Sequence, residues 1–323
     1  LFSNKIDEAF DSTDDTGATT MQTISFDYRF NNLCNFKCRM CGDMLSSSWE
    51  AESRKHKTWD KESQPWMASP LKEQIKKFQD TQIVKEFLDA IETKQIKEIY
   101  WCGGEPLMWD IHWNAMQRII DLGFAKEVYI RYNTNLSRTE FKGIKLFDLL
   151  PQFQDWQICA SIDGTDEVGE YIRDGLNYKQ WLENFKEGLA VAKTSREMRL
   201  DYTITLPGLL ELTNMFNLSV ELNTQILTKV MFTFSNDEIL SPLALPKELM
   251  HTIIDEALEY IEPRATWKQQ SIIDVLKNLK TRPNFVATKK GKQRQERIDK
   301  IRGQDITKIL AKDERVLEWW TNI

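Results

Sequence analysis

Hydrophobic residues recur with two alternating spacings along the first two thirds of the chain, which predicts strands separated by helices. Six short apolar or alternating runs are typical of strands, and they cover residues 21–30, 96–101, 127–132, 155–162, 198–205 and 229–234. Longer segments between them carry apolar residues at helical spacing, for example Trp181, Phe185, Leu189 and Ala192. The helices predicted in this part lie near 46–56, within 71–94, and near 110–122, 139–149, 178–193 and 208–222.

Strand–helix alternation of this kind implies βαβ units, whose strands pair in parallel through right-handed crossovers. The predicted fold class is therefore α/β, with a parallel sheet that closes toward a barrel. After residue 235 the rhythm changes, and the pattern predicts only helices, near 246–262, 266–280, 283–302 and 305–320. We expect three parts: a flexible acidic leader over 1–20, the barrel over 21–235 and a helical region over 236–323.

The composition is that of an ordinary soluble globular protein, since 41% of the 323 residues are hydrophobic and 28% are charged. The net charge of −6 and the pI near 5.4 provide no basic field, so nucleic acid is not expected as the main partner. No run of 18 apolar residues occurs, so we expect no membrane span. Five cysteines, an odd number, do not form a disulfide framework and favour a reducing, cytoplasmic location.

Three of the five cysteines, Cys34, Cys38 and Cys41, follow the first predicted strand with the spacing C-x3-C-x2-C. Thiolates are soft ligands that suit iron–sulfur clusters, zinc or copper(I). A structural zinc site normally has four protein ligands, and no fourth cysteine or histidine lies close behind this triplet. A 4Fe–4S cluster on three thiolates would keep one iron without a protein ligand, which is an open site for catalysis.

Further polar and glycine residues lie where the predicted strands end. Cys102 and the turn Gly103-Gly104-Glu105-Pro106 follow the second strand. Two glycines let the backbone approach a ligand closely, and a carboxylate can pair with an ammonium group. The third strand ends at Asn133-Thr134-Asn135 and the fourth at Ser161-Ile162-Asp163-Gly164. The active sites of barrels lie at the carboxyl ends of their strands, so these groups and the cysteines are expected at one face.

The combination of the cysteine triplet, the GGEP turn and Ser161-Ile162-Asp163-Gly164 resembles radical S-adenosylmethionine (SAM) enzymes of the SPASM/twitch group. The resemblance covers residues 20–235 and implies a partial (β/α)6 TIM-type barrel. It also implies one 4Fe–4S cluster on Cys34, Cys38 and Cys41, whose unique iron chelates SAM. Reductive cleavage of SAM would then give a 5′-deoxyadenosyl radical that abstracts a substrate hydrogen.

The same resemblance implies roles for residues around the cluster. The turn from Gly103 to Pro106 would hold the amino group of SAM through Glu105, and Ser161 with Arg173 would hold its carboxylate. The other residues assigned to SAM are Asn133 and Asn135 at the ribose or methionine part, Asp163 of the same motif, and Met40 beside the adenine, where the family often has an aromatic residue. The residues alone also allow other readings: a solvated Arg173, turn-forming asparagines, and Cys102 as a buried strand end instead of a catalytic residue.

The resemblance favours a peptide or protein residue as substrate, with a flavodoxin- or ferredoxin-like one-electron reductant as partner. Residues 236–323 contain no cysteine, so this region corresponds at most to a twitch-like remnant without an auxiliary cluster. Two alternatives remain: a radical SAM enzyme acting on a small molecule or nucleotide, and a non-catalytic metal-binding interaction module. Residues 289–302 hold seven basic and two acidic side chains; such a run is usually a solvated face, but it also suits an acidic peptide or phosphates.

Overall fold

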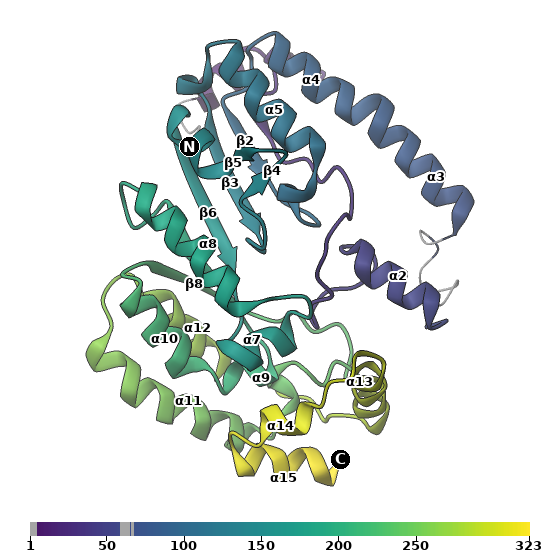
Figure 1. Cartoon of the computed structure of the whole chain (residues 1–323), viewed down its shortest axis with the longest axis vertical. Coiled ribbons are helices and arrows are strands. Elements are labelled where there is room, and N and C mark those ends of the chain that lie inside the picture. Colours follow the sequence, from purple (N-terminus) through teal and green to yellow (C-terminus); the bar gives the residue numbers. More distant parts are fainter. Residues whose placement is uncertain (1–4, 59–64, 66–67) are drawn as a thin grey trace.

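One parallel sheet organises the fold (Figure 1). The computed structural model describes residues 5–58, 65 and 68–323. The strands of the sheet are β1 (Ser25–Phe26), β2 (Glu98–Trp101), β3 (Tyr129–Thr134), β6 (Asp155–Ser161), β7 (Met198–Ile204) and β8 (Gln225–Val230). Each strand pairs in parallel with the next in that order, which confirms the predicted α/β class and partial barrel. β1 and β8 form the two edges, and within the described residues they do not pair, so the barrel is open between them.

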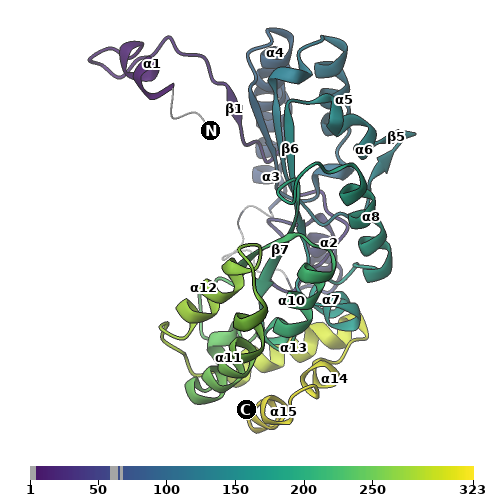
Figure 2. The same cartoon turned by 90° about the vertical axis from the view of Figure 1, so that its left-hand side faces the viewer.

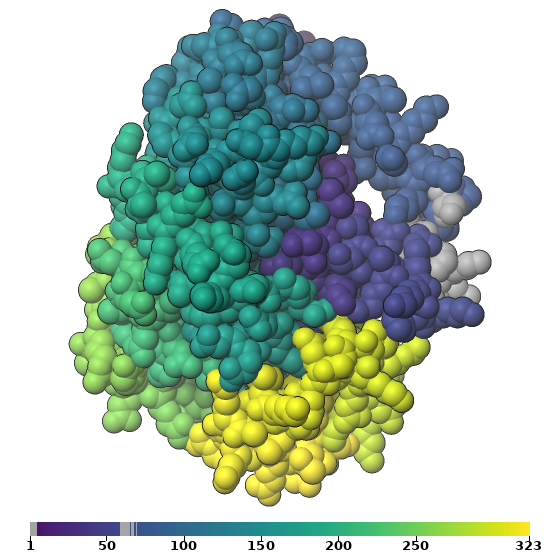
Figure 3. Space-filling model, in the orientation of Figure 1, coloured from purple at the N-terminus to yellow at the C-terminus, as the bar shows by residue number. Residues whose placement is uncertain are grey.

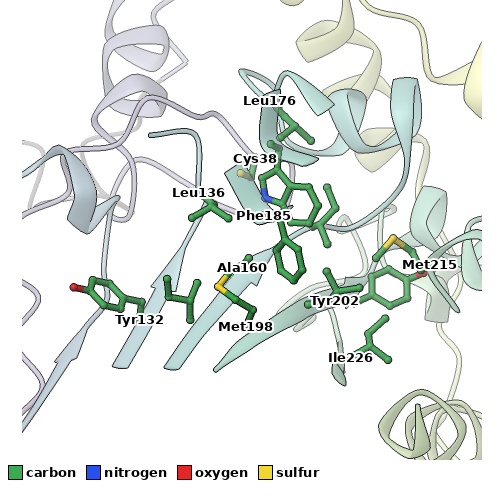
Figure 4. Close-up of a cluster of buried hydrophobic side chains, with 14 of the residues drawn as sticks. Cys38, Tyr132, Leu136, Ala160, Leu176, Phe185, Met198, Tyr202, Met215 and Ile226 are labelled. Atoms are coloured by element: carbon green, nitrogen blue, oxygen red, sulfur yellow. The ribbon is translucent and has the colours of Figure 1, made fainter. Parts of the chain in front are cut away.

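The two faces of the sheet differ because side chains alternate along each strand. One face is apolar and packs under the helices, where Ala160 and Met198 lie beside Phe185 of helix α8, Tyr178–Val191 (Figure 4). The other face carries polar side chains that reach across strands, such as the Tyr100 hydroxyl, which donates to Asn133 Oδ1 at 2.8 Å. The sheet therefore offers a polar concave surface below the ends of the strands.

Helices follow most strands as the sequence predicts. Those before the last strand are α1 (Ile6–Asp11), α2 (Ser47–Lys55), α3 (Ser69–Phe78), α4 (Val84–Glu92), α5 (Asp110–Asp121), α6 (Leu146–Leu149), α7 (Asp166–Ile172), α8 (Tyr178–Val191), α9 (Leu206–Leu209) and α10 (Leu212–Glu221). A π-helical stretch, Gln79–Ile83, joins α3 to α4 without interruption. Figure 2 shows α1, which lies within the predicted leader, on an arm that leads to β1.

Two of the predicted elements are wrong in part. The helix expected over 139–149 begins instead as a hairpin of β4 (Glu140–Phe141) and β5 (Ile144–Lys145). Lys142 and Gly143 between them both have positive φ, 50° and 83°, as in the two-residue turns of tight hairpins. The last strand, expected over 229–234, spans Gln225–Val230: it begins four residues earlier and ends at Val230, opposite Ile204, the last residue of its partner β7. α7 was not predicted.

The C-terminal region is helical, as predicted. It consists of α11 (Lys247–Ile261), α12 (Gln270–Leu279), α13 (Lys289–Arg302), α14 (Ile306–Leu310) and α15 (Glu314–Asn322). α13 returns to the segment around α2, and Figure 3 shows the two in contact on the surface. Within the described part of the chain, every helix is too short or too polar to cross a bilayer.

Candidate functional site

The cysteine loop lies between β1 and α2, and the first turn of α2 holds it in place. The Ser46 side chain caps the helix and donates to the carbonyl of Phe36 at 2.6 Å. Ser48 Oγ donates to the Cys34 carbonyl at 2.8 Å, and Trp49 Nε1 donates to the Cys38 carbonyl at 2.8 Å. These polar side chains satisfy the loop's carbonyls, so an irregular backbone can stay ordered while the cysteine side chains turn inward.

The three thiols share one buried environment. Burial raises the pKa of Cys34 to about 12. A hydrogen bond with Cys41, supported by the charge of Arg173, lowers the pKa of Cys38, and the same bond raises the pKa of Cys41 well above its ordinary value. Cys38 and Cys41 therefore lie close enough to compete for a proton, beside a guanidinium that favours the thiolate form.

The GGEP turn packs directly against the cysteine loop. Gly103 and Gly104 have φ values of +84° and +54°. A Cβ atom on Gly104 would lie 2.5 Å from the carbonyl oxygen of Leu33, the residue before Cys34, so only glycine fits there. The backbone N–H of Glu105 donates to that same carbonyl at 2.7 Å. Pro106 then begins a short 3-10 turn, Pro106–Met108, that leads into α5.

The Glu105 side chain has no exposed surface and connects the GGEP turn to the end of β3. Its carboxylate accepts hydrogen bonds from Thr134 Oγ1 and from the Asn135 backbone N–H, both at 2.6 Å, and from the Leu107 N–H at 3.1 Å. Burial raises the pKa of this carboxyl, and the three donors oppose the rise. The carboxylate thus has protein partners on both oxygens.

Arg173 and Asp163 form a buried ion pair beside the cysteines. Arg173 Nε lies 2.7 Å from Asp163 Oδ2, and Arg173 Nη1 lies 3.8 Å from Cys38 Sγ. Asp163 Oδ1 accepts from the Thr203 N–H at 2.8 Å, which fixes the carboxylate at the ends of β6 and β7. Burial raises the pKa of Asp163. Burial by itself would lower the pKa of Arg173, but the neighbouring carboxylate of Asp163 and the cysteines outweigh it, so the pKa of Arg173 is raised. Asp163 thus holds the guanidinium of Arg173 at the cysteine loop.

The two asparagines expected at SAM lie at different depths. Asn135 is buried, and its Nδ2 donates to Asn35 Oδ1 at 3.0 Å and lies 3.9 Å from Cys34 Sγ. Asn133 lies on the concave face, where its Nδ2 donates to Asp201 Oδ2 at 3.3 Å. Ser161 is the last residue of β6, two residues before Asp163; it is half-buried and lies on the same face as Asn133.

Met40, within the cysteine loop, and Cys102, just before the GGEP turn, have different surroundings. Met40 is half-buried and lines a cavity together with Cys41. Cys102 is buried, with its Sγ 2.8 Å from Asp27 Oδ1. Burial and this hydrogen bond raise the pKa of Cys102 to about 12, so it remains a protonated thiol at neutral pH.

Comparison with known proteins identifies the architecture. The profile of the Radical SAM superfamily matches residues 28–210, more than half of the chain and all of the site described above. The chain belongs to the radical SAM superfamily. Its members are enzymes that use SAM and a 4Fe–4S cluster. No curated protein matches the chain.

Two similar solved structures are radical SAM enzymes with SAM bound. SuiB from Streptococcus suis has 11% sequence identity and a TM-score of 0.46; the match covers 81% of this chain and 52% of SuiB. The enzyme anSMEcpe has 12% identity and a TM-score of 0.45, with 74% of this chain and 60% of that chain covered. This radical SAM chain therefore spans about half the length of SuiB.

The donor set of this radical SAM chain fits a cluster better than a single metal ion. Among the described residues, no three His, Cys, Asp or Glu side chains converge on a point that one ion could occupy. An iron–sulfur cluster presents a different iron to each thiolate, so its cysteines need not converge. Cys34, Cys38 and Cys41, with the guanidinium of Arg173 beside them, would hold such a cluster and offset its negative charge.

The residues that connect the cysteine loop to α7 and α13 were not predicted from the sequence. Arg39, between Cys38 and Cys41, is 1% exposed at its side chain and pairs with Asp299 of α13 at 2.7 Å. Its guanidinium also lies 4.2 Å from the ring centre of Tyr171 on α7. Arg302, at the end of α13, donates to the Lys37 carbonyl at 2.8 Å. Two residues of α13 thus bind the two residues that flank Cys38, and no local sequence pattern signals this contact.

Proposed function

We propose that the three cysteines hold one 4Fe–4S cluster and that the adjoining strand ends bind SAM for radical chemistry on a peptide or protein residue. The observation that carries this proposal is the convergence of motifs far apart in sequence, with Arg173 Nη1 3.8 Å from Cys38 Sγ and Asn135 Nδ2 3.9 Å from Cys34 Sγ. When bound and reduced, the cluster supplies the electron that cleaves SAM to methionine and a 5′-deoxyadenosyl radical.

The protein's part is to bind SAM and orient it. Arg173, held by Asp163, offers its guanidinium to the SAM carboxylate, with Ser161 at the same strand end. The GGEP turn approaches the amino group of SAM. The buried carboxylate of Glu105 holds this turn to the end of β3 by accepting a hydrogen bond from the Asn135 N–H. Asn133 and Asn135 contact the ribose or methionine part, and Met40 lies along the adenine. Cys102, next to the turn, would face SAM.

The finer assignments are part of the same proposal. The substrate is a peptide or protein residue, the reductant is a flavodoxin- or ferredoxin-like protein in the cytoplasm, and residues 236–323 form a twitch-like region without its own cluster. A small-molecule or nucleotide substrate would leave the cluster and SAM assignments intact. A non-catalytic metal-binding module would not, because it would bind metal without cleaving SAM.

The experiment that tests the proposal measures iron and SAM cleavage in the same anaerobic preparations. The reconstituted protein, given dithionite and SAM, should absorb near 400 nm and release 5′-deoxyadenosine and methionine. A Cys34→Ala, Cys38→Ala, Cys41→Ala variant should lose both iron and cleavage, while the matched control Cys159→Ala, inside β6, should keep both. Retention of iron by the triple variant would place the cluster elsewhere and overturn the proposal.

A further inference from the structure

A cavity of about 130 Å³ lies beside the cysteine loop, at the open side of the barrel. Met40 and Cys41 line it from the loop that follows β1, and Met231 to Leu240 line it from the segment that follows β8. These segments continue the two edge strands of the sheet, which do not pair with each other within the described residues. The cavity therefore opens through the gap in the barrel, and α13 forms its third wall with Gly291, Arg294 and Gln295.

Two aromatic side chains border this cavity and have little contact with the protein. Phe232 is 77% exposed and Phe234 is 89% exposed, whereas Ile239 and Leu240 of the same segment are buried. Adjacent exposed aromatic residues at a cavity mouth are typical of a binding surface. The cavity is close in volume to a cavity of about 150 Å³ that admits benzene, so it has room for one side chain; its lining combines apolar residues with charged ones such as Asp237 and Arg294.

The charge of α13 indicates what else the partner carries. The ion pairs that α13 makes with described residues are those of Lys290, Asp299 and Arg302; Arg294, Arg297 and Lys300 make none. All three are exposed, and their spacing of three residues places them along one side of the helix. Of the three, Arg294 lines the cavity together with the aromatic pair, and the row continues from it along α13 as a local positive surface in a chain with a net charge of −6.

We propose that this cavity and the basic row of α13 dock the substrate, and that the substrate is an acidic peptide segment with an apolar side chain. This inference rests on the proposed function and adds the substrate class to it. The apolar side chain enters between Phe232 and Phe234, and carboxylates on either side pair with Arg294 and Arg297. A segment docked there lies next to Cys41 and Met40, and so beside both the cluster site and the position proposed for the adenine of SAM.

The rim of the cavity favours a peptide over a nucleic acid. Asp237 and Glu238 both line the cavity. A nucleic acid carries a phosphate at every nucleotide, and these two acids would repel its backbone. A peptide can place acidic residues only opposite the cations and present neutral residues to Asp237 and Glu238.

Fluorescence anisotropy with the reconstituted full chain tests the docking directly. The probe is a fluorescein-labelled peptide of six acidic residues around one phenylalanine, and the comparison probes are its lysine analogue and a single-stranded DNA of equal charge. We expect the acidic peptide alone to bind, more weakly as salt increases. Arg294→Glu with Arg297→Glu should weaken binding about tenfold, because two attractive pairs become repulsive. Phe232→Ser with Phe234→Ser should also weaken it.

The matched control is Lys76→Glu with Lys77→Glu on α3, which changes the net charge by the same amount on another surface. Equal weakening in the control, or tighter binding of the DNA, would overturn the proposal. Displacement of the peptide by S-adenosylhomocysteine would assign the cavity to the cofactor and overturn it as well. SAM cleavage by the same preparations reports on the proposed function separately, because it is measured without any peptide.

Discussion

At the scale of single residues, Glu105 is a carboxylate whose two oxygens accept three hydrogen bonds from the protein. Glu105→Gln replaces one oxygen with an NH₂ group that faces an N–H donor, so two donors meet without an acceptor. We expect the free energy of unfolding to fall by about 1–3 kcal/mol, the usual result of an unsatisfied buried group, and SAM affinity to fall with it. Urea unfolding and SAM titration of reconstituted protein measure both.

Thr134→Val is the control for this prediction, because it removes one of the three donors and keeps the carboxylate. It should destabilise the protein less than Glu105→Gln does. If Glu105→Gln loses SAM affinity with unchanged stability, the carboxylate contacts SAM and does not support the turn.

Arg173 is the second residue for which the structure gives a clear expectation. Arg173→Ala leaves the carboxylate of Asp163 buried without its partner, which typically costs about 3–5 kcal/mol of stability. Arg173→Met combined with Asp163→Asn removes both charges and should recover much of that loss. Neither variant should bind SAM normally if Arg173 holds its carboxylate. Unchanged SAM affinity in the double variant would remove Arg173 from the site.

Short motifs were the main signal from which the candidate site was predicted. The structure brings the cysteine loop and the GGEP turn together, because parallel strands end at the same edge of the sheet; the roles of these residues toward a cluster and SAM stay predictions. Arg39 and Asp299 could not be predicted in the same way, since they lie 260 positions apart and their pairing depends on the path of the chain between them. Neither residue belongs to a motif that signals its partner.

At the scale of elements, α13 connects the C-terminal region to the cysteine loop through Asp299 and Arg302. Asp299→Ala removes the partner of the buried Arg39, and breaking such a pair typically costs about 3–5 kcal/mol. We expect this variant to be purified with less iron and to lose its cluster faster to a chelator. Arg297→Ala, on the exposed side of the same helix, is the control and should retain iron like the parent. Equal iron retention would show that α13 does not stabilise the loop.

The elements that sequence reasoning misplaced are those decided by a turn or by a neighbouring strand. The apolar residues of 139–149 fit a helix, but Lys142-Gly143 forms a hairpin turn that reverses the chain. The end of β8 depends on where β7 ends, which periodicity within β8 alone cannot show. The longer helices after residue 246 were predictable, because their apolar stripes extend over several turns.

At the scale of the whole molecule, the cysteines limit the number of clusters. Apart from the triplet, Cys102 and Cys159 remain, and they lie on different strands or strand ends, β2 and β6. We predict about four irons per chain after reconstitution, the content of one cluster. Without a second cluster to accept an electron, a redox-neutral outcome such as epimerisation, rearrangement or bond cleavage is expected. About eight irons per folded chain would contradict the premise, and a crosslinked product lacking two hydrogen atoms would contradict the inference.

The contact between Arg302 and Lys37 joins residues 265 positions apart. A ribosome adding about 5–20 residues per second releases the cysteines roughly 13–53 s before the helix that holds their loop. During that interval the loop lacks its contacts with α13, and we expect its thiols to be more accessible to oxidation or to other metals. We therefore expect the proposed cluster to be assembled after translation, once α13 has folded against the loop.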